Sequence, residues 1–172
     1  MAQTERSFVD LMVLLADNTT KGVSPQDLRD AIVSCLGGYA SMYVVGSAIS
    51  QAFTATPTKV TCWAGIGTER GAAADVSNDR IVIGAVGDYL ITLTACVTSA
   101  PPTDLDLAFY KNGVALTGAS TRVQVAAAER TSAMALGVAS LVIGDYIELY
   151  AAATPDSAIV FRDAHFTLKR LG

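Results

Sequence analysis

The stretch Asp88-Tyr89-Leu90-Ile91-Thr92-Leu93-Thr94 mixes apolar side chains with small polar ones in alternation. A period of two residues is typical of a strand that has one face in a core and the other toward solvent. From about residue 59 onward, this stretch belongs to a series of comparable segments at close spacing, over residues 59–66, 80–86, 88–98, 105–111, 121–127, 132–142, 145–153 and 158–169. Such a row of strands predicts a mainly β protein, a sandwich or a barrel, so function must be sought on a β-scaffold.

Turn residues separate these segments. Lys111-Asn112-Gly113 carries the Asn-Gly signal of a tight hairpin after residues 105–110. Ala100-Pro101-Pro102-Thr103 marks a loop, because proline cannot donate a hydrogen bond to a strand ladder. Residues 66–79 are rich in glycine and alanine and are expected to form the longest loop.

The composition points to a chain that buries surface against copies of itself. Charged residues make up only 16% of the 172 residues, while hydrophobic residues reach 51%. An ordinary protein has about 25% charged residues, and a charge-poor surface is typical of obligate oligomers. The net charge of −4 argues against a nucleic-acid partner, since binding to phosphates rests on clustered Lys and Arg.

Residues 31–58 contain no charged side chain and are long enough to cross a bilayer, which takes about 20 residues. Glycine, serine and proline interrupt this stretch, and no basic cluster flanks it to set an orientation. We therefore expect no membrane span. The amino terminus also lacks the pattern of a signal peptide, because charged residues interrupt its apolar run.

The first 44 residues differ in character from the rest. Ser24-Pro25-Gln26-Asp27 is a favourable helix start, since serine caps and proline suits the first helical position. The predicted helix runs to about Leu36 and ends at Gly37-Gly38. So short a helix is marginal alone in water and needs a partner surface. The chain is therefore divided into an N-terminal anchoring segment (1–44), a connector or first edge strand (45–58) and a β-domain (59–172).

Four blocks of the β-domain together resemble one known superfamily. They are Gly87-Asp88-Tyr89-Leu90-Ile91-Thr92-Leu93, Leu105-Asp106-Leu107-Ala108-Phe109-Tyr110-Lys111-Asn112-Gly113, Gly144-Asp145-Tyr146-Ile147-Glu148-Leu149 and Phe161-Arg162-Asp163-Ala164-His165-Phe166-Thr167-Leu168. In order and spacing they are similar to the jelly-roll β-sandwich of the tumour necrosis factor and complement globular head superfamily, over about residues 80–172. The resemblance implies a compact homotrimer, with residues 59–172 as the trimerisation domain.

The resemblance also implies aromatic and aliphatic side chains around a three-fold axis. The candidates for this axis are Tyr89, Phe109, Tyr146, Tyr150 and Phe166. The alternative is that most of these rings fill the core of their own protomer. The many alanines at 126–128 and 151–153 depart from the pattern of the animal members, and nothing resembles a collagen stalk.

A second resemblance lies in the N-terminal segment. Residues 15–30, Leu15-Ala16-Asp17-Asn18-Thr19-Thr20-Lys21-Gly22-Val23-Ser24-Pro25-Gln26-Asp27-Leu28-Arg29-Asp30, are similar to a module near the amino termini of tailed-phage virion proteins. With a trimeric jelly roll, this module resembles phage head fibres, capsid decoration proteins and short tail fibres. The resemblance implies an anchoring role, and the candidate docking residues are Asp17, Asn18, Leu28, Arg29 and Ile32.

The chain offers little that resembles a catalytic site. His165 is the sole histidine, and Asp163 shares its strand face, but no activated nucleophile accompanies the pair. The segment Gly65-Ile66-Gly67-Thr68-Glu69-Arg70-Gly71 resembles a dinucleotide loop with its third glycine one position late, and no crossover helix follows. It is therefore interpreted as a β-connection. We expect no enzymatic activity and no cofactor.

Metal ligation is not favoured either. Asp75, Asn78 and Asp79, or Asp104 with Asp106, could offer oxygen atoms to calcium, but neither set has the spacing of a dedicated loop. Solvated turn carboxylates are the simpler interpretation. The three cysteines, Cys35, Cys62 and Cys96, fit neither a disulfide framework nor a CxxC metal site, so buried thiols are expected.

These observations predict a bacteriophage virion protein, a homotrimeric head fibre or capsid decoration protein whose N-terminal segment docks on a capsid or tail protein. Its expected location is the virion, after assembly in the cytoplasm of the host bacterium. The alternative is the receptor- or carbohydrate-binding tip of a tail fibre, with a host surface glycan as partner. Trp63 is the sole tryptophan, and the loops at 66–79, 99–104, 117–120 and 154–158 lack aromatic residues, which favours the decorating role.

Overall fold

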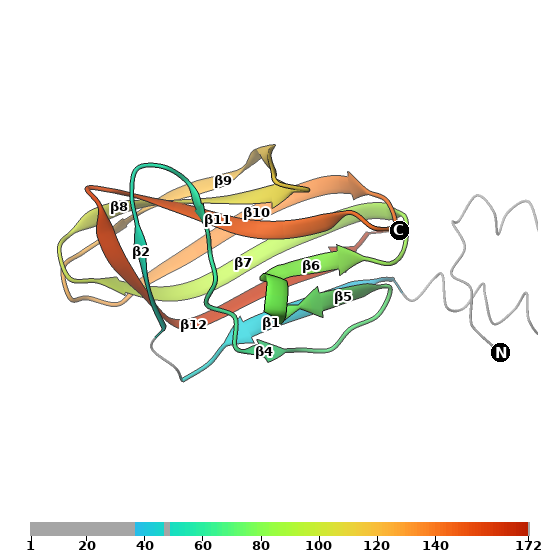
Figure 1. Ribbon diagram of the computed structural model, residues 1–172, viewed down its shortest axis with the longest axis horizontal. Coiled ribbons are helices and arrows are strands. Elements are labelled where there is room, and N and C mark those ends of the chain that lie inside the picture. The colour runs from blue at the N-terminus through green and yellow to red at the C-terminus, as the bar shows by residue number, and fades with distance from the viewer. Residues whose placement is uncertain (1–36, 47–48, 172) are drawn as a thin grey trace, which may run out of the picture.

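The computed structural model of the chain describes residues 37–46 and 49–171. They form two six-stranded antiparallel sheets that pack face to face (Figure 1). Sheet A has the order β10 (Thr131–Leu141), β7 (Gly87–Ser99), β12 (Ser157–Arg170), β1 (Tyr39–Val44) and β4 (Gly65–Ile66), and β2 (Ile49–Phe53) pairs with β12. Sheet B has the order β5 (Ala72–Asp75), β6 (Arg80–Ile83), β11 (Tyr146–Thr154), β8 (Thr103–Lys111) and β9 (Val114–Val125), and β3 (Thr58–Lys59) pairs with β11.

The core lies between the two sheets and is lined by every second residue of the long strands. In β7, for example, Tyr89, Ile91 and Leu93 are fully buried, while the residues between them face outward. The rings of Phe109 in sheet B and Phe166 in sheet A stack across the core with centroids 5.6 Å apart. The alternation predicted from the sequence is therefore confirmed in the long strands.

The predicted hairpin is confirmed as well. Asn112 and Gly113 connect β8 to β9 with φ angles of 51° and 79°. Two consecutive positive φ angles match the right-handed twist of the flanking strands, which is why Asn-Gly is preferred in this turn.

The expected domain boundaries need correction. β1 lies within the expected anchoring segment (1–44) but is a strand of sheet A. The segment 45–58, expected as a connector or first edge strand, contains β2, which pairs with β12. β1 lies between β12 and β4, with Met42 opposite both Phe166 and Ile66. The described part of the sandwich therefore begins before residue 44.

Two expectations about the following stretch are also wrong. Residues 59–66 do not form one strand, because β3 and β4 each contain only two residues at its ends. Residues 66–79 are not a single loop: they contain β5 and the 3₁₀ turn Val76–Asn78, which leads into β6.

The helix predicted from residue 24 to about Leu36 lies outside the described residues, as do the docking candidates Asp17, Asn18, Leu28, Arg29 and Ile32. Within residues 37–46 and 49–171, no helix has the length and apolar character needed to cross a membrane.

Candidate functional site

Three of the five aromatic residues expected at a three-fold axis belong to the protomer core. Tyr89, Phe109 and Phe166 have no exposed surface. The Tyr89 hydroxyl donates a hydrogen bond to the carbonyl oxygen of Ala85 at 2.8 Å, and the two phenylalanine rings stack on each other. Since these side chains are enclosed between the sheets, they cannot contact another copy of the folded chain. This corrects the expectation for these three residues.

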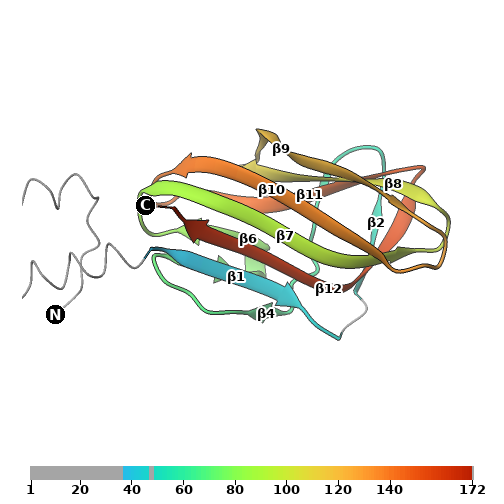
Figure 2. The same ribbon diagram turned by 180° about the vertical axis from the view of Figure 1, so that it is seen from behind.

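The outer face of sheet A carries a row of exposed apolar side chains that the sequence did not single out. Met134, Leu136 and Val138 on β10 are 68%, 57% and 61% exposed. In Figure 2, β10, β7, β12 and β1 lie side by side across this sheet. Beside the apolar row stand Thr94, Thr92 and the half-buried Leu90 of β7.

Over residues 133–138 of β10 the large side chains point outward and the small ones point inward, which reverses the usual arrangement. The core-facing residues of this stretch are Ala133, Ala135 and Gly137, and a Cβ on Gly137 would lie 2.7 Å from the Cβ of Ala119 in β9. The neighbouring strand leaves room only for small residues on that side. A strand with its larger apolar residues in water has an unpartnered face.

His165 and Asp163 both lie on this outer face, as predicted, but they do not form a catalytic pair. The Asp163 carboxylate accepts a hydrogen bond from the backbone N–H of Gly46 at 3.3 Å. The His165 ring is packed beside Tyr43 of the adjacent strand β1, with ring centroids 5.9 Å apart. The carboxylate therefore holds a backbone group rather than orienting the imidazole.

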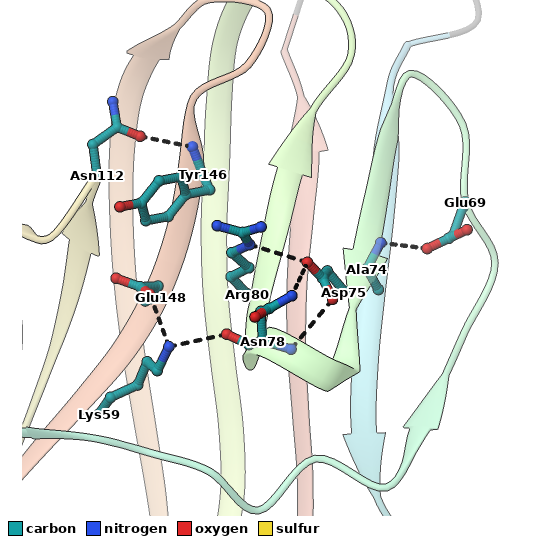
Figure 3. A network of polar contacts seen from close by, with 9 residues as sticks. All are labelled: Lys59, Glu69, Ala74, Asp75, Asn78, Arg80, Asn112, Tyr146 and Glu148. Carbon is teal, nitrogen blue, oxygen red and sulfur yellow. Dashed lines mark hydrogen bonds and ion pairs between the residues drawn. The ribbon is translucent and has the colours of Figure 1, made fainter.

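The outer face of sheet B carries a group of aromatic and charged side chains, which we call the tyrosine cluster: Tyr110, Tyr146, Tyr150, Glu148, Lys59 and Arg80. The rings of Tyr110 on β8 and Tyr150 on β11 are stacked with centroids 3.8 Å apart and planes 19° apart. The guanidinium of Arg80 lies 4.9 Å from the centroid of the Tyr146 ring (Figure 3). Tyr146 and Tyr150, expected at the axis, thus lie on the face of sheet B that is turned away from sheet A.

Glu148 sits at the centre of the tyrosine cluster. On β11 it alternates with Tyr146 and Tyr150, and it pairs across the ladder with Tyr110 on β8. Although charged, it is only 6% exposed. Its Oε1 accepts a hydrogen bond from Lys59 Nζ at 3.1 Å, and the same ammonium donates to the carbonyl oxygen of Asn78 at 3.0 Å (Figure 3).

The electrostatics of this region follow from partial burial and paired charges. Burial raises the pKa of Tyr150, and the nearby negative charge of Glu148 adds to the effect. Burial also raises the pKa of Asp79, against the opposing influence of Lys59. The pKa of Asp75 is lowered, first by the hydrogen bond from the Asn78 side chain and also by Arg80.

Two of the carboxylates considered as calcium ligands, Asp75 and Asp106, are bound by protein donors. Asp75 accepts hydrogen bonds from the backbone N–H of Asn78 at 3.2 Å, from Asn78 Nδ2 at 2.9 Å and from Arg80 Nε at 3.1 Å. Asp106 is bound by both Nε and Nη2 of Arg122, at 2.6 and 2.7 Å. Among the residues that the structure describes, no three potential metal-ligating side chains gather at one point.

The glycine-rich segment 65–71 is a β-connection, as the sequence predicted. Residues 65–66 form β4 against β1, and the backbone N–H groups of Gly67 and Arg70 donate to the carbonyl oxygens of Ser41 and Tyr39 at 2.9 and 2.7 Å. Its amide donors are thereby used within the sheet instead of pointing at a phosphate.

The two described cysteines are free thiols in different settings. Cys62 is buried, which confirms the expectation for this residue, and burial raises the pKa of its thiol to about 12. Cys96 is partly exposed on β7, opposite Ser132 on the outer face of sheet A. Cys35 lies outside the described residues.

No family model matches the chain, and no curated protein matches it in sequence. Solved structures do share its architecture. The globular domain of the zebrafish complement 1qA protein superposes with a TM-score of 0.56 at 15% identity, covering 78% of this chain and 98% of that one. Murine APRIL at pH 5.0 gives 0.54 at 16% identity, covering 78% and 99%, and the Eiger TNF of S. frugiperda gives 0.54 at 10% identity, covering 78% and 94%. The chain therefore has the two-sheet jelly-roll fold of the tumour necrosis factor and complement C1q domains.

Proposed function

We propose that this chain is a structural protein of a bacteriophage virion, a homotrimeric head fibre or capsid decoration protein that docks through its N-terminal segment. The observation that carries the assembly part is the outer face of sheet A, where Met134, Leu136 and Val138 are each more than half exposed. Full burial of a side chain of this size is worth about 1.5–3 kcal/mol. Three of them, each about two-thirds exposed, would contribute roughly 3–6 kcal/mol per protomer on assembly.

The virion part of the proposal rests on the resemblance of residues 15–30 to a module of tailed-phage proteins. The topology is compatible with an anchor at that end of the chain, because Tyr39 at the start of β1 pairs with Lys169 near the end of β12. Residue 37 thus enters the sandwich at the end where the chain leaves it (Figure 1). Three protomers related around sheet A would all present this end in the same direction. Asp17, Asn18, Leu28, Arg29 and Ile32 are the proposed docking residues.

Light scattering on the full chain tests the assembly. We expect the mass of a trimer at micromolar concentration and the mass of a monomer for Leu136→Lys, since a lysine would place a charge in the middle of the apolar row. The matched control is Val114→Lys on β9 of sheet B, where the valine is 69% exposed and the trimer should persist. A monomeric wild-type chain would overturn the assembly.

The virion location has a separate test. Antibody raised against the chain should label intact phage particles from a lysate of the source strain, and peptides of the chain should copurify with those particles through a density gradient. Particles that lack both the label and the peptides would refute the location and leave the trimer untouched.

A further inference from the structure

We propose that the outer face of sheet B carries a carbohydrate-binding site centred on the tyrosine cluster, which takes neutral, hydroxyl-rich pyranosides. This goes beyond the virion role and does not depend on it. The segments predicted as loops lack aromatic residues, and one of them, 117–120, is in fact part of β9. The structure instead gathers three of the six tyrosines on adjacent strands of one sheet face. The aromatic surface that a sugar needs is therefore on the strands.

The rings have small neighbours on one side and polar neighbours on the other. Tyr150 lies opposite Ala108 on β8 and Lys59 on β3, and Tyr110 lies opposite Ala115 on β9 and Glu148 on β11. Tyr110 and Tyr150 are half-buried, so part of the aromatic surface of the stacked pair reaches solvent. Exposed aromatic surface is the kind of surface on which the C–H groups of a pyranose pack.

Charged side chains lie beside the rings on the same sheet face. Among the described residues, Lys59 is the hydrogen-bond donor to Glu148, and it binds Oε1, so Oε2 retains its accepting capacity. Tyr110 is the ladder partner of Glu148 on β8, Tyr150 is the next outward residue on β11, and Lys59 Nζ lies 3.1 Å from Oε1. A carboxylate fixed among aromatic rings can accept hydrogen bonds from two neighbouring hydroxyls of one sugar.

The charges on this face favour a neutral ligand. Each basic group is paired with an acid: Lys59 with Glu148 at 3.1 Å, Arg80 with Asp75 at 3.1 Å and, farther along the sheet, Arg122 with Asp106 at 2.6 Å. An anionic ligand would have to compete for cations that are already paired, and a cationic ligand would meet no unpaired acid at the centre of the cluster. A polyhydroxylated ligand can use the same groups without separating the pairs.

The first experiment uses the unmodified full chain with tyrosine rings labelled with ¹³C, so that nuclear magnetic resonance reports on the six tyrosines. Maltotriose, cellotriose, chitotriose and lactose are the probes, each titrated to millimolar concentration after a screen on a neutral-glycan array. With a bound probe, we expect the resonances of Tyr110, Tyr146 and Tyr150 to shift. The resonances of Tyr39 and Tyr43, on sheet A, should not shift. A silent array and no shift with any probe would refute the site.

The second experiment separates the ring from its hydroxyl. For the glycan that binds best, Tyr150→Ala should weaken binding at least tenfold in calorimetry, whereas Tyr150→Phe should stay within about threefold. Gln124→Ala, an exposed polar position on the same face near the far end of β9, is the control and should leave affinity unchanged. Unchanged affinity in a folded Tyr150→Ala variant would overturn the proposal. Shifts of the tyrosine resonances that appear with a protein partner but with no glycan would overturn it as well. Light scattering on the same samples reads assembly independently, so this inference and the trimer fail separately.

Discussion

Asp145 offers the sharpest test of how this sandwich is held together. It is 8% exposed in the turn between β10 and β11. Its Oδ1 accepts a hydrogen bond from Asn112 Nδ2 at 2.7 Å, and its Oδ2 accepts one from the N–H of Val142 at 2.9 Å and pairs with Lys111 Nζ at 2.8 Å. A single carboxylate thus binds groups both in its own turn and at the tip of the β8–β9 hairpin.

The magnitude follows from the pKa of this carboxyl. Burial raises it, but the hydrogen bonds from Lys111, Val142 and Asn112 together lower it from 3.8 to about 2. At roughly 1.4 kcal/mol for each pH unit between the two values, the ionised carboxylate stabilises the fold by about 2 kcal/mol. Since the folded pKa is depressed, this stability is fully present well above pH 3.8 and is lost as the pH falls through about 2.

The perturbation is Asp145→Asn, compared with wild type by urea unfolding at one protein concentration from pH 7 to pH 2. We expect the variant to be about 2–3 kcal/mol less stable at pH 7, and the difference to shrink to a few tenths of a kcal/mol near pH 2. Asp106→Asn is the matched control: its pair with Arg122 is exposed, 39% and 66% for the two side chains, so the loss should stay below about 1 kcal/mol. A loss at Asp145 that is as small as the control, or that does not shrink with acid, would refute the reasoning.

Three further outcomes follow from packing and chemistry. Gly137→Ala should lower the free energy of unfolding by about 1–3 kcal/mol, because the new Cβ would lie 2.7 Å from the Cβ of Ala119. Adding Ala119→Gly should restore most of the lost stability, and a double variant as unstable as the single one would contradict this contact. Gly113→Ala should lower the free energy of unfolding, measured by chemical denaturation, by about 1 kcal/mol. No atom lies within 4 Å of the new Cβ, so the loss would come from the φ of 79°, and unchanged stability would contradict this backbone strain. At pH 8 a thiol reagent should not label Cys62, because burial raises the pKa of its thiol to about 12. The same reagent should label the partly exposed Cys96 faster in a monomeric variant than in the trimer, and equal labelling rates would argue against assembly through sheet A.

The elements that the sequence predicted well are those whose pattern is local. β7, β8 and β12 alternate along most of their length, so their existence can be read from a short window. The β8–β9 hairpin is equally local, because two adjacent residues, Asn112 and Gly113, determine its turn.

The elements that the sequence missed depend on distant partners. β1 alternates too, with Ala40, Met42 and Val44 buried, but its small and hydroxyl-bearing residues resemble a linker. Its place in the sheet comes from pairing with β12, near the other end of the chain. β3 and β4 are only two residues long, too short for any periodicity, and exist because β11 and β1 offer them backbone partners.

The outer face of sheet A shows where a period of two residues no longer indicates which side of a strand is buried. In β12 after the bulge between Phe161 and Asp163, one parity is apolar, so Phe166 belongs to the core and His165 to the surface. In β10 both parities are apolar, and the pattern cannot say which one faces inward. The choice is made by Ala119, whose Cβ would lie 2.7 Å from a Cβ on Gly137, and by Phe109, whose Cδ2 would lie 3.4 Å from it. Only small residues fit there, so Met134, Leu136 and Val138 must point outward. The packing that removes Phe109 from the surface is thus the cause of the apolar row proposed to hold the trimer.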